Sequence, residues 1–231
     1  MAFGMNYKGQ QPINCNVPGL PGSSIDCLPN AGVAVFRGTP EQAVDFCERL
    51  RQVLTEYDAG QVYFDNIDVS QVQWSALNFS LLIDVLQEKS VTTKRLKVFK
   101  AGLDDDCVRL IAGWLETLPP KGLPSELHLS HNSATRDGFE ALLTAIENKR
   151  AELPEPAVPI WLRMESNPVD LSAEGEVVKP LLEAGRVAFV QRICDRHPGM
   201  GAVAMPILGG GKGWAATPVQ RPAQVLRQPV V

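Results

Sequence analysis

The stretches that most resemble known chemical motifs lie near the carboxyl end of the chain and could in principle hold a phosphate. Gly209-Gly210-Gly211-Lys212-Gly213 resembles the end of a phosphate-binding loop, but the G-x-x-x-x-G-K-[ST] pattern would need other residues at Pro206 and Gly213. Gly199-Met200-Gly201-Ala202-Val203-Ala204 imitates the G-x-G-x-x-A turn of dinucleotide-binding folds, yet proline and more glycine follow it instead of a helix. Neither stretch therefore predicts a nucleotide site.

Other residues have the right types for catalysis or metal binding but the wrong placement. His128 and His131 lie three apart on an expected strand, where alternation sends them to opposite faces, so they do not share a metal ion. Asp104-Asp105-Asp106 lies where a helix begins, and the helix dipole favours acidic groups there, so we interpret it as a cap. No serine lies in a G-x-S-x-G elbow. We therefore expect no enzyme, no metal site and no cofactor.

The elements that must position any binding residues form a repeated pattern of strand and helix. Four stretches have apolar residues two apart, as in a strand, and each is followed by apolar residues at helical spacing. They are Gln61–Phe64, Arg95–Phe99, Glu126–Asn132 and Trp161–Asn167. Their first apolar residues are Val62, Leu96, Leu127 and Leu162, which are 34, 31 and 35 residues apart. Self-similarity at such a period indicates a stacked repeat protein.

Two of these stretches resemble a known repeat. Leu127-x-Leu129-x-x-Asn132 and Leu162-x-Met164-x-x-Asn167 resemble the L-x-L-x-x-N core of leucine-rich repeats, and the helical connections resemble the ribonuclease-inhibitor-like subclass. The resemblance implies an α/β solenoid of about four repeats, with parallel strands on the concave side and helices on the convex side. It also implies that each asparagine amide bonds the backbone of neighbouring turns.

Two features depart from the leucine-rich pattern. At the asparagine position the first two repeats have Ile67 and Ala101. The period is also longer than the roughly 20–29 residues that are usual for such repeats. An ordinary α/β domain with parallel strands is therefore the alternative.

The repeats divide the chain into three expected parts. Residues 1–38 are rich in proline and glycine and are expected to form an irregular N-terminal arm, apart from a short strand at 31–36. Residues 39–194 are expected to form the leucine-rich-repeat-like domain, which opens with a capping helix at 40–57. Residues 195–231 are expected to form a proline- and glycine-rich basic C-terminal arm.

The helix after each strand is expected to bury one apolar stripe. The stripes are Leu77, Leu81, Leu82, Val85 and Leu86; then Cys107, Leu110, Ile111, Trp114, Leu115 and Leu118; then Phe139, Leu142, Leu143 and Ile146; and last Val177, Val178, Leu181 and Leu182. Pro180 lies inside the last helix and should shorten or kink it, because proline removes a backbone donor. Residues 187–194 are expected to close the stack as a strand or helix.

The charge of the chain is unevenly distributed. The net charge of −4 includes −10 in residues 40–184 and +5 in residues 185–231. A basic end on an acidic body favours an acidic partner, either protein or nucleic acid, although it can instead contact the body itself.

Cysteine usage indicates the compartment. The five cysteines are odd in number and include no C-x-x-C pair, so a reducing intracellular compartment fits best, cytoplasmic or nuclear, with an organelle also open. Cys47 and Cys107 lie at apolar helix positions and are expected in the core. The sequence has no apolar run of about 18 residues, so no membrane span is expected.

Residues between the buried apolar positions should form columns on the open side of the sheet. One expected column is Tyr63, Lys97, His128 and Arg163, the next is Asp65, Phe99, Ser130 and Glu165, and Trp161 precedes the last strand. Parallel strands place neighbouring members about 4.8 Å apart. Basic and aromatic groups together suit an acidic peptide or single-stranded RNA. The alternative is a solvated face where charges pair, such as Lys97 with Asp65 and Arg163 with Glu165.

The predicted function follows from these columns and from the basic arm. The predicted binding residues are Tyr63, Lys97, Phe99, His128, Trp161 and Arg163, with Trp214, Arg221 and Arg227 in the arm. They favour a non-catalytic protein–protein interaction scaffold, a structural subunit of a larger protein or ribonucleoprotein assembly. One alternative is an RNA-binding protein that uses the open face and the basic arm. Another is a regulatory subunit that docks a single enzyme.

Overall fold

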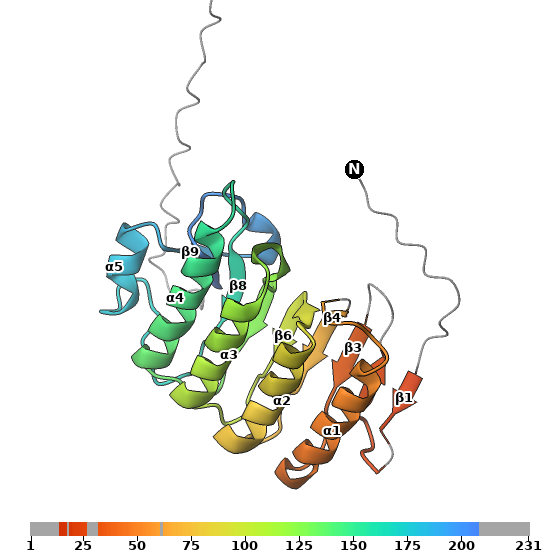
Figure 1. Ribbon diagram of the computed structural model, residues 1–231. Helices are drawn as coiled ribbons and strands as arrows, with labels where there is room; N and C mark the ends of the chain where they lie inside the picture. Colours follow the sequence, from red (N-terminus) through yellow and green to blue (C-terminus); the bar gives the residue numbers. More distant parts are fainter. Residues whose placement is uncertain (1–13, 18, 27–31, 61, 208–231) are drawn as a thin grey trace, which may run out of the picture.

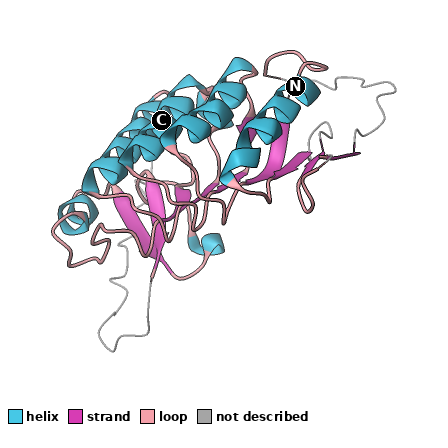
Figure 2. Ribbon diagram, turned by 90° about the horizontal axis from the view of Figure 1, so that it is seen from below, coloured by secondary structure: helices cyan, strands magenta, loops and turns pink. Residues whose placement is uncertain are grey.

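Strands and helices alternate along the chain and build a sheet with its helices on one face (Figures 1 and 2). The computed structural model describes residues 14–17, 19–26, 32–60 and 62–207. The helices are α1 (Ala43–Leu54), α2 (Ala76–Glu88), α3 (Asp105–Thr117), α4 (Arg136–Ala151) and α5 (Val178–Glu183). The strands are β1 (Asn14–Asn16), β2 (Ser24–Asp26), β3 (Gly32–Val35), β4 (Tyr63–Asp68), β5 (Thr92–Thr93), β6 (Arg95–Lys97), β7 (Glu126–His128), β8 (Ile160–Arg163), β9 (Val187–Val190) and β10 (Val203–Pro206).

The sheet is mostly parallel. Its order is β1-β2-β3-β4-β6-β7-β8-β10-β9, and β5 pairs with β4. β1, β2 and β3 form an antiparallel meander, and every pairing from β3 onward is parallel. α1 to α4 lie side by side in chain order over the sheet (Figure 1). The predicted α/β class with parallel strands is confirmed.

The helices begin where the sequence supplies a capping side chain. The Ser75 hydroxyl accepts a hydrogen bond from the Asn78 N–H at 3.1 Å, and the Asp104 carboxylate accepts one from the Cys107 N–H at 3.0 Å. Each bond satisfies an N–H group that the first turn of a helix leaves unpaired. The capping interpretation is thus confirmed for Asp104. α5 has only six residues and contains Pro180, which agrees with the expected shortening.

Apolar residues of strands and helices meet in one core between the two layers. Leu96, Leu127 and Leu162, from three neighbouring strands, are completely buried there. Cys47 and Cys107 are also buried, as predicted, and burial raises the pKa of both thiols to about 12. Both cysteines therefore act as small apolar residues of the core.

Leu77 is the exception among the predicted core residues of α2, because 74% of it is exposed. The stripe that packs against the sheet includes Phe79, Leu82, Ile83 and Leu86. Successive residues of a helix turn by about 100°, so Leu77 lies about 200° from Phe79 and faces away from the sheet. The prediction that Leu77 is buried is wrong for this reason.

The register of β4 also differs from the expected one. Ile67 lies beside Leu96, Leu96 beside Leu127, and Leu127 beside Leu162. The first step is therefore 29 residues and starts at Ile67, whereas the sequence pattern places Val62 in this row. The later steps of 31 and 35 residues agree with the prediction.

An extra residue in β4 interrupts the alternation of side chains along this strand. Gly32 of β3 pairs with Phe64, but the next residue, Val33, pairs with Asn66, so Asp65 is left over between them. Such a bulge disrupts the alternation of side chains along a strand. An alternation that starts at Phe64 therefore loses its phase before the second half of β4.

The chain leaves four neighbouring strands through the same left-handed turn. Gln71, Lys100, His131 and Ser166 have φ angles of 64°, 51°, 60° and 60°. Ile67, Leu96, Leu127 and Leu162 are the register partners on these strands. Each left-handed residue lies four positions after the register partner of its own strand. Because residues other than glycine seldom adopt these angles, their recurrence means that the four exits share one geometry.

An asparagine side chain ties the third exit to the second. The Asn132 Oδ1 accepts hydrogen bonds from the Ala101 and Leu103 N–H groups at 2.8 and 3.1 Å. Its Nδ2 donates to the Val98 and Leu129 carbonyls at 2.8 and 2.9 Å. Asn132 thus satisfies backbone groups in two successive turns, as the sequence predicted for its amide.

Asn167 makes the equivalent contacts one turn further along. Its Oδ1 accepts from the Ala134 N–H at 2.9 Å, and its Nδ2 donates to the Leu129 and Met164 carbonyls at 2.9 and 2.8 Å. The first repeat has no asparagine at the equivalent position. The register of the sheet places Val72 there, so the expectation that Ile67 occupies the asparagine position is wrong.

Both ends of the sheet contain strands in segments that were expected to be irregular. β1, β2 and β3 lie within residues 1–38, where only the strand at 31–36 was predicted and is found as β3. β10 lies in the segment 195–231 and inserts between β8 and β9. Val203, Ala204 and Met205 are all buried, and a strand buried on both faces shows no alternation by which to recognise it. The expectation of irregular structure is corrected at these strands, while residues 1–13 and 208–231 lie outside the described residues.

Candidate functional site

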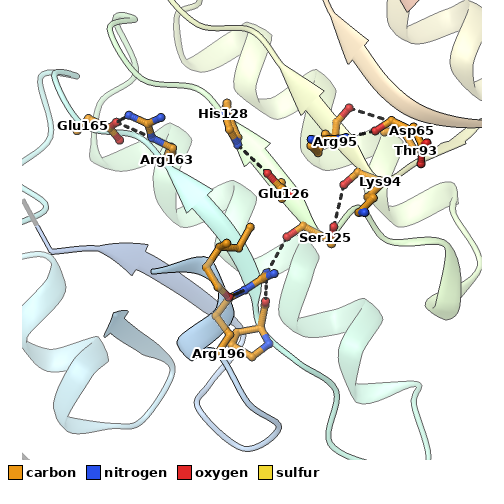
Figure 3. A network of polar contacts seen from close by, with 12 residues as sticks. Asp65, Thr93, Lys94, Arg95, Ser125, Glu126, His128, Arg163, Glu165 and Arg196 are labelled. Carbon is orange, nitrogen blue, oxygen red and sulfur yellow. Dashed lines mark hydrogen bonds and ion pairs between the residues drawn. The ribbon is translucent and has the colours of Figure 1, made fainter. Parts of the chain in front are cut away.

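The sheet face opposite α1 to α4 (Figure 2), called the open face below, carries three rows of side chains, and Figure 3 shows some of their members. The first row contains Arg95, Glu126, Trp161 and Ala204. The second contains Asp68, Lys97, His128 and Arg163. The third, aligned by backbone bonds beyond the strands, contains Ser70, Phe99, Ser130 and Glu165. Neighbours in a row lie on adjacent strands, about 4.8 Å apart along the hydrogen-bonding direction.

The structure brings together most of the predicted second row and replaces its first member. Lys97, His128 and Arg163 are register partners, as predicted. Tyr63 is not beside Lys97: it pairs with Thr92, and Asp68 takes the expected place. The sequence does carry a signal for Asp68, because Ile67-Asp68-Val69 has the same apolar–polar–apolar pattern as Leu96-Lys97-Val98.

The third row also differs from the expected one because of the register of β4 against β6. Phe99, Ser130 and Glu165 are neighbours as predicted, but Ser70 replaces Asp65 beside Phe99. The Ser70 hydroxyl accepts a hydrogen bond from the Phe99 N–H at 3.1 Å. Asp65 instead contacts β6 through its backbone carbonyl, which accepts a hydrogen bond from the Arg95 Nε at 3.3 Å (Figure 3). The expected pair of Lys97 with Asp65 is not found in the described part of the chain.

Several charges on the open face are paired. Arg37 Nη2 lies 2.8 Å from Asp68 Oδ2. Arg163 Nε donates to Glu165 Oε1 at 2.8 Å, so the predicted pair of Arg163 with Glu165 is confirmed (Figure 3). The open face therefore combines acidic and basic groups instead of forming a uniformly basic surface.

Burial and neighbouring charges shift two pKa values in the second row. Burial raises the pKa of Asp68, but the bonds from Arg37 and Ser70 outweigh it and leave this pKa below its usual value. Burial lowers the pKa of His128, Glu126 opposes this shift, and the positive charges of Arg163 and Lys97 add to it. Asp68 is therefore ionised and His128 neutral near pH 7.

Two polar atoms of charged side chains on the open face lack a partner in the described part of the chain. Within the described residues, the Lys97 ammonium makes no hydrogen bond or ion pair. The Glu165 Oε2 is buried and also has no hydrogen-bond partner there, although 9% of the Glu165 side chain remains exposed. Close by, the Phe99 and His131 rings meet edge to face with centroids 5.0 Å apart. An unpaired ammonium and a carboxylate with one unpaired oxygen thus lie on neighbouring rows of one face.

Trp161 does not supply the exposed aromatic contact that was predicted. It is 8% exposed and packs in a small apolar cluster with Val190 and Ala204, against which Met200 also packs. The cluster lies at the end of the sheet where β10 is inserted. Trp161 is therefore a packing residue of the open face.

Arg196, which no sequence motif marks, anchors the segment that carries Met200. Its Nη1 donates to the carbonyls of Ser125 and Pro159 at 2.8 and 2.7 Å (Figure 3), and its Nε donates to the Ile193 carbonyl at 2.9 Å. Nothing in the local sequence around Arg196 indicates these partners, because two of them come from distant parts of the chain.

A second candidate feature lies on the helical layer. A shallow groove of about 550 Å³ between α3 and α4 is lined by Arg109, Ala112, Gly113, Glu116, Asp137, Glu140, Ala141 and Thr144. Its lining combines small residues with charged side chains that also occur along any solvated helix surface. The open face is therefore the stronger candidate site.

The remaining sequence predictions concern metals, membranes and the C-terminal arm. Residues 14–17, 19–26, 32–60 and 62–207 contain no cluster of three or more metal-binding side chains. None of the helices in the described part of the chain is long and apolar enough to span a membrane. Trp214, Arg221 and Arg227 lie outside the described residues. No protein-family model matches the chain, and no curated protein matches it.

Proposed function

We propose that this protein is a non-catalytic protein–protein interaction scaffold that binds a protein partner on its open face, as a structural subunit of a larger assembly. The observation that carries the proposal is the set of charged side chains held in register on that face, of which Lys97 and the Glu165 Oε2 remain unpaired. The unpaired Lys97 ammonium can pair with a carboxylate of a partner, and such complementary charges select the partner.

We also propose that the fold is a short, divergent leucine-rich-repeat-like solenoid. Support comes from the alternation of strand and helix, from the four equivalent left-handed exits and from the bonds of Asn132 and Asn167. The placement of β10 between β8 and β9 departs from simple stacking in chain order. A stack of this kind offers a rigid surface, because each unit is fixed by its neighbours.

The distribution of charge favours protein over RNA as the partner. Asp68, Glu126 and Glu165 lie among the basic groups of the open face, and residues 40–184 carry a net charge of −10. RNA has a phosphate at every nucleotide, so these carboxylates would repel it. A protein can instead oppose each charge with a group of the other sign.

Affinity purification from the native cell, followed by mass spectrometry and RNA detection, tests this function. We expect protein subunits to be recovered with the wild-type chain and lost with the double variant Lys97→Glu/Arg163→Glu. The matched control Lys121→Glu/Lys179→Glu reverses the same number of positive charges at exposed positions elsewhere and should keep the partners. A thermal unfolding curve of each variant checks that it is folded.

The outcomes separate the alternatives. A single enzyme recovered in one-to-one ratio would support a regulatory subunit over a subunit of a larger assembly. Recovery of RNA without protein would favour the RNA-binding alternative. Recovery of the chain alone, or of the same partners with Lys97→Glu/Arg163→Glu, would contradict the proposed function.

A further inference from the structure

We propose that the protein partner places an acidic side chain at Lys97 and that His128 takes up a proton when this carboxylate binds. The inference rests on the proposed function and adds the chemistry of the contact and its dependence on pH. It follows from the position of Lys97, from the hydrogen bond of His128 and from the charges on the three strands around them.

Lys97 lies next to a carboxylate that is already engaged. Its register partner Asp68 receives hydrogen bonds from Arg37 Nη1 and Nη2 at 3.4 and 2.8 Å. The Asp68 Oδ1 also accepts from the Ser70 N–H at 3.1 Å. Since the Lys97 ammonium forms no hydrogen bond or ion pair within the described residues, this cation is available to a carboxylate from outside.

Arg95, two residues earlier on the same strand, extends this cationic strip. Its Nε donates to the Asp65 backbone carbonyl at 3.3 Å, and it forms no ion pair within the described residues. β6 thus presents two cations on the open face, followed by the Phe99 ring. An extended acidic segment with an apolar residue beyond its carboxylates would complement this order.

The hydrogen bond to Glu126 determines where His128 can take up a proton. The His128 Nε2 lies 3.1 Å from the Glu126 Oε2 (Figure 3). An ionised carboxylate only accepts hydrogen bonds, so Nε2 carries the hydrogen and Nδ1 is free of one in the neutral ring. Added protons therefore go to Nδ1, which then becomes a donor.

The charges around His128 explain why the uptake is linked to binding. Glu126 on its own strand favours the imidazolium, while Lys97 on β6 and Arg163 on β8 oppose it. A carboxylate bound at Lys97 offsets the positive charge of that neighbour and accepts a hydrogen bond from the new donor. Binding and protonation thus favour each other, and by linkage the partner binds more tightly at lower pH.

Nuclear magnetic resonance of the full chain tests the contact with a defined probe. The probe is acetyl-tetraglutamate amide, and acetyl-tetraglutamine amide is its neutral control. The chain has three histidines, and the variant His128→Gln identifies the His128 signal. At a saturating concentration of the acidic peptide, we expect the pKa of His128 to rise by about one unit, which equals a tenfold preference of the probe for the protonated form.

Matched variants make the result specific. Lys97→Met should abolish the rise in the pKa of His128, whereas Lys121→Met, an exposed lysine away from the open face, should leave it unchanged. A peptide concentration of about 10 mM is high enough to detect binding with a millimolar dissociation constant. If the His128 signal does not shift up to this concentration, the inference is overturned. A shift that persists in Lys97→Met would also overturn it. A single-stranded uridine decamer is the third arm, and a shift with this RNA but not with the peptide would overturn the choice of an acidic protein segment.

The partner recovered by purification gives an independent measurement. We expect capture by the wild-type chain to be several-fold stronger at pH 6 than at pH 7.5, and this difference to disappear in His128→Gln. If capture needs Lys97 and Arg163 but neither pH nor the acidic peptide has an effect, this inference fails and the scaffold function stands. If capture survives Lys97→Glu/Arg163→Glu, the scaffold function itself fails.

Discussion

Asp105, in the first turn of α3, caps the next helix of the chain through Gly138. The Asp105 Oδ1 accepts hydrogen bonds from the Gly138 N–H at 3.1 Å and from the Thr135 N–H at 2.7 Å. Its Oδ2 accepts one from the Thr135 hydroxyl at 2.6 Å. These bonds lower the pKa of Asp105 although burial acts to raise it. Neighbouring units are therefore tied at their helix ends as well as through the sheet.

The contact of Asp105 with Gly138 predicts opposite effects for two similar substitutions. A Cβ added to Gly138 would lie 2.4 Å from the Asp105 Oδ1, whereas a Cβ added to Gly113 in α3 meets nothing within 4 Å. Alanine in a helix is favoured over glycine by about 1 kcal/mol. We therefore expect Gly113→Ala to raise the free energy of unfolding by about that amount and Gly138→Ala to lower it. Urea unfolding of both variants measures this, and a stabilised Gly138→Ala would contradict the tight contact.

Asn132 should be among the most sensitive polar residues of the fold. It is 8% exposed, and its replacement by alanine leaves the buried Ala101 and Leu103 N–H groups without an acceptor. We expect a loss of about 2–4 kcal/mol in the free energy of unfolding, since unsatisfied buried groups cost about 1–3 kcal/mol each and losses are not additive.

Asn132→Asp provides a sharper test of the same bonds. The carboxylate keeps an acceptor for the two N–H groups but loses the donors to Val98 and Leu129. We expect Asn132→Asp to be destabilised at neutral pH because its charge faces two carbonyl oxygens. If both variants unfold at the same urea concentration as the wild type, the asparagine bonds do not support the stack.

His128 predicts a dependence of stability on pH. The unfolded chain takes up this proton near pH 6.5, but the pKa of His128 is lowered in the folded protein by burial and by the nearby cations. Below pH 6.5 the unfolded state therefore binds more protons, so the free energy of unfolding falls as the pH drops through the folded pKa and then levels off.

Comparison with His128→Gln isolates this contribution. The variant should lose part of the decrease in stability that the wild type shows below about pH 6.5. Urea unfolding of the wild type and of His128→Gln at a series of pH values measures this difference, and equal slopes for the two would contradict the neutral, half-buried histidine.

Arg196→Met should loosen the C-terminal end of the sheet locally. The variant loses the donors to Ser125 and Pro159 but keeps an apolar stem. We expect backbone hydrogen exchange in residues 191–202 to accelerate by about tenfold, equivalent to about 1.4 kcal/mol, while exchange in α1 and α2 stays as in the wild type. Unchanged exchange in 191–202 would show that Met200 and its neighbours hold this segment without Arg196.

Local patterns in the sequence were sufficient for much of the fold. The helices after β4, β6 and β7 were predictable because their caps and apolar stripes involve residues within a few positions of each other. The alignment of Lys97, His128 and Arg163 was also predictable, because these strands keep strict alternation. The bonds of Asn132 were expected from the resemblance of its segment to a leucine-rich repeat.

The tertiary structure alone decided the remaining features of the site. Asp68 lies beside Lys97 because β4 pairs with both β5 and β6 at one constant offset, which places Tyr63 beside Thr92 instead. Trp161 is covered because β10 and Met200, some 40 residues further along the chain, pack against it. The physical reason is common to both: periodicity and capping are local properties of the chain, whereas register and burial depend on contacts between residues far apart in sequence.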